Sequence, residues 1–255
     1  MESSDPCVEK EEINREKEEI IMKKITLLIL LLLCLGTMLQ ADDGKTLPAD
    51  KFVQVLRSAG TGETWGRLTG TVAHRRRGQQ PIEAPISFRT LFTSKAVVGQ
   101  LVFREKELYQ LTQSRLAPYS SSVETTGKST LPDVGILPSD LVMNFIYWNF
   151  KGEEKPETVR MQECRVLLFE SPKTKDLVKV YASAAYVFPI KVEWMDKKTG
   201  KPFRILDVNG LEKVNDLWVV SEVAVSGPGW KSIIRFKKLE AGQNKDGVPA
   251  DLFVE

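Results

Sequence analysis

Residues 187–213 read VFPIKVEWMDKKTGKPFRILDVNGLEK, a pattern typical of an antiparallel hairpin. Phe188, Ile190, Val192 and Trp194 recur at every second position, as expected for a strand with one buried face. Residues 196–200 (DKKTG) are typical of a hairpin turn, and a second strand-like run follows over 202–213. The stretch therefore predicts two paired strands with an apolar face.

Similar runs, rich in Val, Ile, Thr and aromatic residues, occur on both sides of this hairpin. We expect strands near 65–76, 84–94, 96–104, 107–113, 158–170, 176–184, 217–226 and 230–239. In the last run, Trp230, Ser232, Ile234 and Phe236 share one face. Short turns separate most of the runs, so the strands are predicted to pair antiparallel along the chain.

Two segments between the runs are predicted to be irregular. Residues 117–136 are rich in Ser, Thr, Gly and Pro, and residues 151–156 (KGEEKP) are mostly charged. A first helix is predicted over residues 47–59, where Phe52 and Leu56 fall on one face with Val55 and Gly60 ends the pattern.

A second helix is predicted over residues 137–150, LPSDLVMNFIYWNF. Leu141, Phe145 and Trp148 recur at helical spacing, and Ile146 widens the apolar stripe, as does Val142. Ser139 is the expected N-cap, with Pro138 just outside the helix. Such a helix either plugs a sheet as part of the core or forms the wall or lid of a hydrophobic cavity, and both interpretations stay open at this point.

Together these elements predict a mainly β fold with few helices. Eight to ten antiparallel strands joined by short turns form one large curled sheet, a half-open β-barrel, with helices covering the concave face. Because such a face is apolar, it must be covered by helices or filled by a ligand.

The amino terminus has the features of an export signal. Lys23 and Lys24 precede an apolar run of about 11 residues, followed by small and polar residues up to Ala41. The run is shorter than the ~20 residues that a transmembrane helix needs. We expect cleavage after Ala41 and a mature domain over 42–255. Residues 1–21 carry eight acidic residues, the wrong sign for a signal, so translation is expected to begin at Met22.

Composition argues against several functional classes. The net charge of +2 gives no basic field for nucleic acid. After the expected cleavage, His74 and Cys164 are the only residues of their kinds, so neither a metal cage nor an intramolecular disulfide is predicted. Cys164 alternates with apolar residues and is expected to be buried. His74, at the fraying end of a strand beside three arginines, is a poor catalytic base. We therefore predict a non-enzymatic protein without cofactors.

Several strings in the second half of the chain resemble, in their order, an outer-membrane lipoprotein-sorting protein of the Lol carrier-like (LolA/LolB-like) superfamily. The resemblance covers roughly residues 48–255. It rests on Asp140-Leu141, residues 145–148 (FIYW), 164–168 (CRVLL), 188–193 (FPIKVE), Leu217-Trp218-Val219 and the strand 231–239.

The resemblance implies a periplasmic, monomeric carrier whose apolar cavity holds lipoprotein acyl chains or another lipid, with inner- and outer-membrane sorting proteins as possible partners. The alternative that it implies is an envelope regulator or scaffold that binds a protein. The early-strand lid arginine of the best-known carriers, in an Arg-Pro-x-x-Phe context, has no match here among Arg67, Arg89 and Arg104. The candidate cavity and lid residues are Trp65, Phe88, Phe103, Leu141, Phe145, Ile146, Trp148, Phe188, Trp194 and Trp230.

Overall fold

The computed structural model describes residues 43–58 and 62–253, so the expected signal segment lies outside the described residues. The chain divides into two units, 1–46 and 47–255. Of the first unit, only the short helix α2 (Asp43–Thr46) is described. Neither described stretch contains a helix with the length and hydrophobicity that membrane crossing needs.

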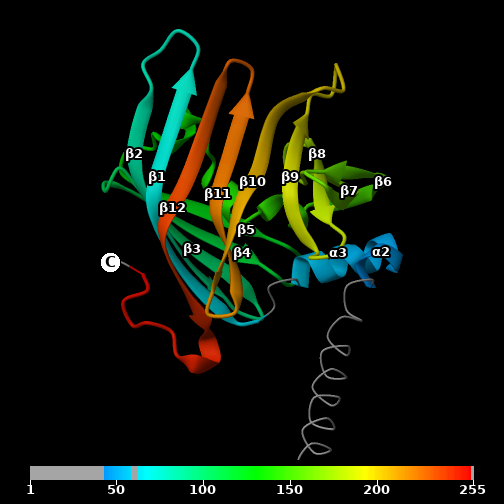
Figure 1. The fold of residues 1–255 in the computed structure, drawn as a ribbon, viewed down its shortest axis with the longest axis horizontal. Coiled ribbons are helices and arrows are strands. Elements are labelled where there is room, and N and C mark those ends of the chain that lie inside the picture. Colours follow the sequence, from blue (N-terminus) through cyan, green and yellow to red (C-terminus); the bar gives the residue numbers. More distant parts are fainter. Residues whose placement is uncertain (1–42, 59–61, 254–255) are drawn as a thin grey trace, which may run out of the picture. The chain divides into compact units, whose positions relative to one another are not determined.

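The second unit is built from one antiparallel sheet with a few short helices (Figure 1). Its helical elements are α3 (Ala49–Ser58), η1 (Leu131–Val134), α4 (Pro138–Leu141), η2 (Asn144–Tyr147) and η3 (Asn244–Asp246). The strands are β1 (Thr64–Arg76), β2 (Ile82–Phe92), β3 (Ala96–Phe103), β4 (Glu107–Ser114), β5 (Ser121–Thr126), β6 (Asn149–Val159), β7 (Gln162–Glu170), β8 (Leu177–Ser183), β9 (Phe188–Met195), β10 (Pro202–Val214), β11 (Leu217–Gly227) and β12 (Trp230–Gln243).

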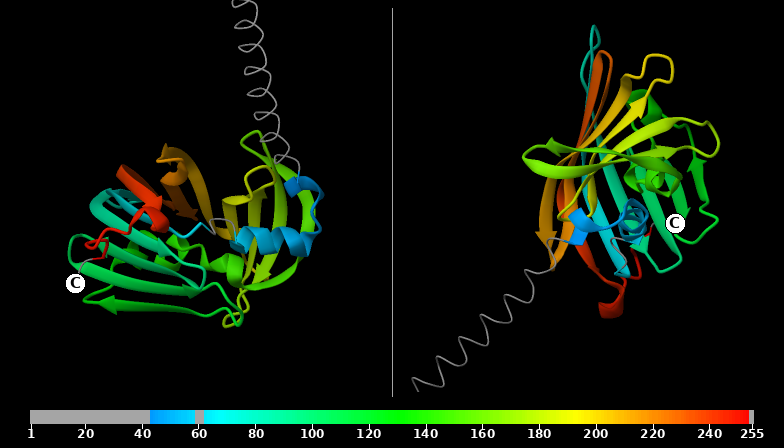
Figure 2. Two further views of the ribbon diagram at one scale, coloured as in Figure 1. Left: turned by 90° about the horizontal axis from the view of Figure 1, so that it is seen from below. Right: turned by 90° about the vertical axis from the view of Figure 1, so that its right-hand side faces the viewer.

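The twelve strands follow the order β5-β4-β3-β2-β1-β12-β11-β10-β9-β8-β7-β6. Two meanders, β1 to β5 and β6 to β12, are joined by the pairing of β1 with β12, and β5 and β6 remain as the two edges. The sheet curls strongly without closing (Figure 2). This confirms the mainly β class and the curled antiparallel sheet.

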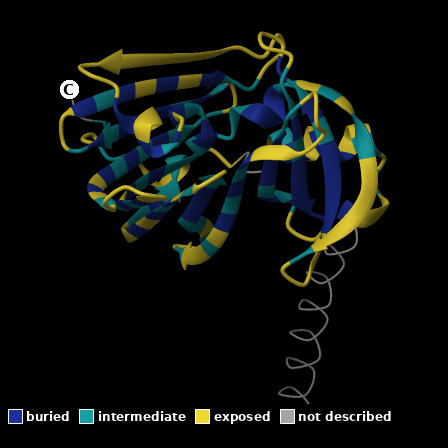
Figure 3. Ribbon diagram, turned by 90° about the horizontal axis from the view of Figure 1, so that it is seen from above, coloured by how far each residue is buried: buried dark blue, intermediate teal, exposed yellow. Residues whose placement is uncertain are grey.

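The core lies on the concave side of the sheet, where burial alternates along the strands (Figure 3). In β12, Ser232, Ile234 and Phe236 are buried while their neighbours are more exposed, as the sequence predicted. Helix α3 adds Phe52 and Leu56 to the same core, which confirms the predicted first helix. Val55 was wrongly predicted on that face: it is 39% exposed, and Val53 is buried in its place. Cys164 is fully buried in a smaller apolar cluster, as expected.

The loop predicted over 117–136 was partly wrong, because it contains β5 and η1. All residues of β5 are exposed, and its Ser- and Thr-rich sequence gives no alternating apolar pattern. The strand forms because its backbone pairs with β4, for example Gln110 opposite Glu124. Local propensity carried no sign of this tertiary pairing.

The turn predicted over 151–156 was also wrong, because these residues belong to β6. Register shifts after Phe150 and Glu154 accommodate Gly152, with its φ of 144°, and Pro156. Bulges on an edge strand tolerate both residue types. The turn between β6 and β7 lies at Arg160-Met161, both with positive φ. Because β5 and β6 add to the predicted strands, the sheet has twelve strands rather than eight to ten.

The single helix predicted over 137–150 is broken into two short pieces, α4 and η2. Met143 separates them with a φ of 50° and ψ of 42°, a left-handed conformation that ends α4. Leu137, not Ser139, is the N-cap, and Pro138 is the first helical residue. Residues 138–148, called the wall segment below, therefore turn twice, and their apolar side chains point in more than one direction.

Candidate functional site

The concave side of the sheet holds an apolar cavity of about 430 Å³. Strands β1, β2, β10, β11 and β12 supply most of its lining, and α3 adds Leu56. The wall segment lines another side through Leu141, Val142, Met143 and Ile146. A volume in this range is typical of small-molecule sites in proteins.

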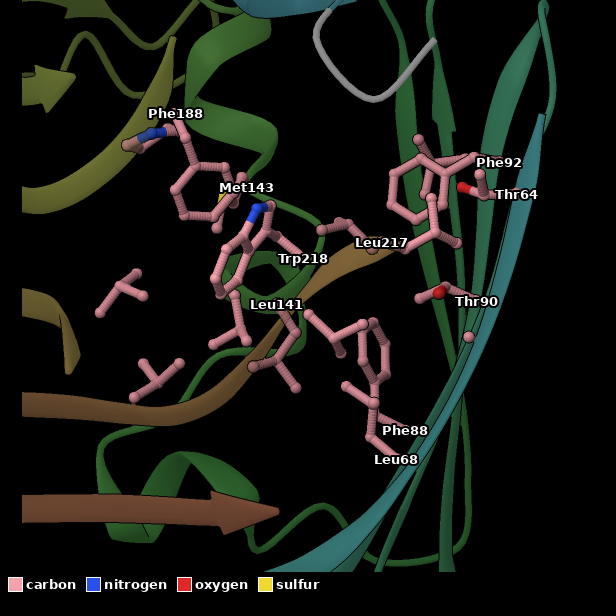
Figure 4. Close-up of a pocket in the computed structure, with 18 of the residues that line it drawn as sticks. Thr64, Leu68, Phe88, Thr90, Phe92, Leu141, Met143, Phe188, Leu217 and Trp218 are labelled. Carbon is pink, nitrogen blue, oxygen red and sulfur yellow. The ribbon is translucent and has the colours of Figure 1, made fainter. Parts of the chain in front are cut away.

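Figure 4 shows how the lining side chains face one another across this space. Leu68 and Phe88 project from β1 and β2, and Leu141 faces them from the wall segment. Phe188 of β9 and Trp218 of β11 lie beside the wall segment. The lining is thus almost wholly hydrocarbon and aromatic, a surface that favours apolar ligands.

A buried ion pair fixes the first half of the wall segment. Arg204, at the start of β10, donates from Nη1 to Asp140 Oδ1 at 3.1 Å and from Nη2 to Oδ2. The Leu137 backbone N–H donates to Asp140 Oδ2 at 2.8 Å, so the same carboxylate also caps α4. Arg204 stacks on Trp194, with its guanidinium carbon 4.3 Å from the ring centroid. These contacts tie α4 to β9 and β10.

A second arginine fixes the other end of the wall segment. Arg57 of α3 donates to the carbonyl oxygens of Ile146 and Trp148, each at 2.8 Å. The Tyr147 hydroxyl donates back to Arg57 O at 3.3 Å. Carbonyls at a helix end lack partners within the helix, and a guanidinium satisfies them well. The wall segment is therefore held at both ends by side chains from other elements.

The residues predicted for the site divide into two groups. Trp65, Phe88, Leu141, Ile146 and Phe188 line the cavity. The others lie away from it in or beside the core: Phe103, Phe145, Trp148, Trp194 and Trp230. The two groups differ in their surroundings, although the sequence shows the same residue types in both.

Members of both groups have contacts that explain their places. Phe145 is fully buried and packs edge-on against Trp194 at 5.8 Å between centroids. Trp230 lies over Gly135, whose φ of 74° and close contact with the ring leave no room for a side chain. Trp65 borders the cavity, but its indole N–H donates to Gly247 O at 3.0 Å. These aromatic residues therefore act mainly in packing.

Two exposed aromatic residues at the cavity were not predicted. Tyr186 and Trp218 both line the cavity, yet they are 66% and 65% exposed. They are the large apolar side chains of the lining that are most exposed to solvent. Trp218 follows a turn at Asn215-Asp216, both of which have positive φ. The face of the sheet to which the Trp218 side chain points could not be read from the sequence, because register shifts near Gly210 interrupt the alternation between β10 and β11.

His74 is buried, so its predicted place at a fraying strand end was wrong. Within β1 it stays paired with both neighbouring strands, opposite Ser232 and Ile82. Its Nδ1 lies 2.8 Å from Ser232 Oγ, and the Ser232 hydroxyl donates to Val134 O. Burial, and the charge of Arg76, lower the pKa of His74. The neutral ring thus links β1 and β12 to η1 and has a structural place.

The polar groups elsewhere are also engaged in structure. Glu107 accepts hydrogen bonds from the Tyr109 hydroxyl at 2.6 Å and from the Thr130 backbone N–H at 2.7 Å. Burial alone would raise the pKa of Glu107, but these bonds outweigh it and lower the pKa. Within residues 43–58 and 62–253, no three His, Cys, Asp or Glu side chains gather as a metal would require. The side chains that line the cavity are mostly apolar and suit an apolar ligand.

The three arginines considered for the early-strand position lie elsewhere. Arg67 pairs with Glu240 and Asp251, Arg89 donates to Ser87, and Arg104 donates to Thr130. Arg57 and Arg204, which do hold the wall segment, come from a helix and a late strand. Neither lies in a sequence motif that would have singled it out.

No family model and no curated protein matches this sequence. Solved structures do match the fold. A DUF1329 family protein from Desulfovibrio piger superposes with a TM-score of 0.59 at 14% identity, covering 80% of this chain and 97% of that chain. An outer membrane lipoprotein-sorting protein domain from Vibrio parahaemolyticus gives 0.56 at 15% identity, covering 80% and 96%.

A LolA superfamily protein from Nitrosomonas europaea gives a TM-score of 0.53 at 8% identity, covering 82% of this chain and 99% of that chain. These identities are low, so the likeness concerns the fold alone. The chain therefore has a LolA-like fold, shared with an outer membrane lipoprotein-sorting domain, as the resemblance in the sequence implied.

Proposed function

We propose that this protein is a non-enzymatic carrier in outer-membrane lipoprotein sorting that binds the acyl chains of lipids or lipoproteins. The observation that carries the proposal is the apolar cavity of about 430 Å³ beneath a wall segment. Burial of an acyl chain there is favoured by roughly 25 cal/mol per Å² of surface removed from water, less the ordering costs. The LolA-like fold supports the same proposal.

The test is direct binding to the purified protein lacking residues 1–41. Native mass spectrometry and lipid extraction should find co-purified lipid, and N-phenyl-1-naphthylamine should fluoresce in the cavity and be displaced by lysophosphatidylcholine. A Leu141→Asp variant, which places a charge in the lining, should lose the signal. Ser139→Asp is the matched control, because Ser139 lies on the same helix and does not line the cavity. Absence of both lipid and probe binding would reject the proposal.

We also propose that residues 22–41 direct the protein to the periplasm and are removed, leaving a domain over 42–255. The support is the basic start, the apolar run and Ala41 in the sequence. Mass measurement of the exported protein should give an amino terminus at Asp42. A protein that keeps the apolar run after export would contradict the cleavage.

The rival function is that of a regulator or scaffold for another envelope protein. A concave face filled with large side chains, without a cavity, would favour it. The cavity supports the carrier instead. Crosslinking in intact cells distinguishes the two, because a scaffold gives one stable protein partner even when Leu141→Asp blocks the cavity.

A further inference from the structure

One end of the sheet carries a row of hairpin turns rich in basic residues. The turns that join β1 to β2, β11 to β12 and β9 to β10 lie side by side along this end (Figure 1). The Arg77 backbone N–H donates to Gly229 O at 2.9 Å, so the first two turns are in contact. Ile205 of β10 lies opposite Ser226 of β11, which brings the third turn to the same end.

The turn between β7 and β8 continues this row. Leu177, the first residue of β8, lies opposite Met195, the last residue of β9. Lys197 Nζ donates to Thr174 O at 3.4 Å and links the last two turns. The four turns with their flanking residues are called the basic rim below: residues 75–83, 170–177, 195–203 and 227–231.

The basic rim holds the excess positive charge of the domain. Residues 1–41 contain five of the 36 basic and eight of the 34 acidic residues, which leaves 31 basic and 26 acidic residues in 42–255. The rim has nine basic and four acidic residues, an excess of five, so the remainder of 42–255 is neutral. The nine basic residues are all exposed: Arg75, Arg76, Arg77, Lys173, Lys175, Lys197, Lys198, Lys201 and Lys231.

The acidic residues of the rim neutralise little of this charge. Glu170 lies 3.6 Å from Lys175, and within residues 43–58 and 62–253 no other basic residue of the rim forms an ion pair. Asp196 accepts from the Thr199 backbone N–H at 2.8 Å and so stabilises its own turn. Asp176 accepts from a neighbouring hydroxyl. Eight basic side chains therefore remain available to an anionic partner.

We propose that the protein binds an anionic phospholipid bilayer through the basic rim. Its charges are spread over four turns on exposed side chains, which suits many phosphates in one plane. Phe203, which is 45% exposed, is the exposed large apolar side chain of the rim and lies close to Lys201 in sequence. Aromatic and basic side chains together favour the boundary between lipid and water. A protein partner would instead favour an apolar centre with few charges.

The basic rim is separate from the cavity, so this inference goes beyond the function proposed above. No rim residue lines the cavity. Trp218 lies nine residues before Gly227 along β11, which separates it from the rim by roughly 30 Å at about 3.3 Å per residue. When the rim lies on a bilayer, the exposed cavity residue Trp218 is therefore distant from the lipid surface.

Sedimentation with lipid vesicles tests the binding. At about 0.1 M salt, the purified protein lacking residues 1–41 should bind phosphatidylcholine vesicles with about one-third phosphatidylglycerol at least about tenfold more tightly than pure phosphatidylcholine vesicles. Binding should be lost at about 1 M salt, because the Debye length falls from about 10 Å to about 3 Å. Equal binding to both vesicles, or binding that salt does not weaken, would overturn the proposal. No binding to the anionic vesicles would also overturn it, in favour of an acidic protein as the partner.

Two sets of four Lys→Gln substitutions separate the rim from the net charge, because both remove the same charge. Each basic side chain near an anionic surface strengthens binding about fivefold, so the rim set should weaken vesicle binding at least about a hundredfold. The control set, outside the rim, should weaken it less than about tenfold. Equal weakening in folded variants, judged by circular dichroism, would contradict the role of the rim. The rim set is Lys173, Lys198, Lys201 and Lys231, and the control set is Lys51, Lys95, Lys155 and Lys245, all exposed.

Phe203→Ala tests the contact of the ring with lipid. It should weaken binding to the anionic vesicles about tenfold and leave the dependence on salt unchanged. Leu211→Ala is the control, because Leu211 is 41% exposed and lies outside the rim, and it should bind as the unchanged protein does. Unaltered affinity of the Phe203→Ala variant would show that the ring does not enter the bilayer and would overturn this part of the proposal.

Fluorescent labels on single introduced cysteines test the orientation. Thr199 lies in the rim, Ser94 lies in a turn at the opposite end of the sheet, and both are exposed. Cys164 is buried, so the label reacts at Thr199→Cys or Ser94→Cys. A quencher attached to lipid should quench the label at position 199 and spare the label at 94. The reverse result would overturn the proposed orientation.

The Leu141→Asp variant distinguishes this proposal from the carrier function. It should lose N-phenyl-1-naphthylamine fluorescence and still bind the anionic vesicles, because Leu141 lies outside the rim. The rim set of substitutions should have the opposite effect. If vesicle binding fails while the probe still binds, the rim proposal alone is wrong. If the probe fails while vesicle binding persists, the carrier function is wrong and binding through the rim stands.

Discussion

Arg204 of β10 and Asp140 of the wall segment form a buried ion pair across 64 positions of sequence. Their side chains are 10% and 3% exposed, and the same carboxylate caps α4. One residue pair thus determines both the local start of a helix and its attachment to the sheet.

We expect Arg204→Met to destabilise the protein by about 3–5 kcal/mol, because Asp140 is left buried without its partner. Urea unfolding followed by circular dichroism measures the change. Asp216→Asn is the control: it removes the exposed pair with Lys213 and should leave the free energy of unfolding almost unchanged. The double variant Arg204→Met with Asp140→Leu should recover part of the loss. If Arg204→Met and Asp216→Asn changed the free energy of unfolding equally, the buried pair would not stabilise the protein more than the exposed pair does.

The wall segment should separate stability from binding. Phe145 is fully buried against Trp194, so Phe145→Ala should lower the free energy of unfolding by about 3–5 kcal/mol. Met143 is half-buried and lines the cavity, so Met143→Ala should cost about 1 kcal/mol and alter probe affinity. Urea titrations and N-phenyl-1-naphthylamine titrations of both variants check this division. The idea is wrong if Met143→Ala leaves probe binding unchanged.

His74 should contribute a pH dependence to stability. Burial and Arg76 hold its pKa below the ordinary value of 6.5, so the folded protein binds this proton less readily than the unfolded chain. As pH falls below about 6.5, the unfolded chain is protonated first and the free energy of unfolding decreases. His74→Gln should reduce the difference in urea midpoint between pH 7.5 and pH 5.5. An undiminished difference in that variant would assign the pH dependence to other groups.

Cys164 should be inert in the folded protein. It is fully buried, and burial raises the pKa of its thiol. In the protein lacking residues 1–41 it is the sole thiol, so Ellman's reagent reports on it alone. We expect no reaction within an hour in buffer and complete reaction in urea. Met161→Cys, at a position that is 97% exposed, supplies a fast-reacting control. Rapid reaction of native Cys164 would show that its strand opens locally.

Much of the sheet could be predicted because alternation is a local signal. Residues 187–213 and the last strand gave the correct period, and the first helix had a clear apolar face. β5 could not be predicted, because its side chains are all exposed and the strand is specified by backbone pairing with β4. The break at Met143 was equally hidden, since helical spacing continues through it while the Arg204 and Arg57 contacts hold the two halves apart.

The sequence predicted an apolar cavity on the concave face, and five of the ten candidate residues line the cavity of the structure. The remainder could not be separated from the core, because packing and lipid binding use the same side chains. Trp218 was missed as a lining residue for a different reason. A bulge near Gly210 changes which face each residue presents, and bulges depend on the partner strand.

The pairing of β1 with β12 has a consequence for how the chain acquires its structure. Thr64 lies opposite Gln243, so this seam joins nearly the two ends of the domain, whereas other neighbouring strands follow one another along the chain. Closing so long a loop is entropically costly and slow. Each half can assemble as a local meander, but β1 and β12 can pair only after the last strand has been synthesised. Until then the edges of β1 and β11 and their apolar inner surfaces have no partner strand, and the newly made chain is most exposed to aggregation and proteolysis at that stage.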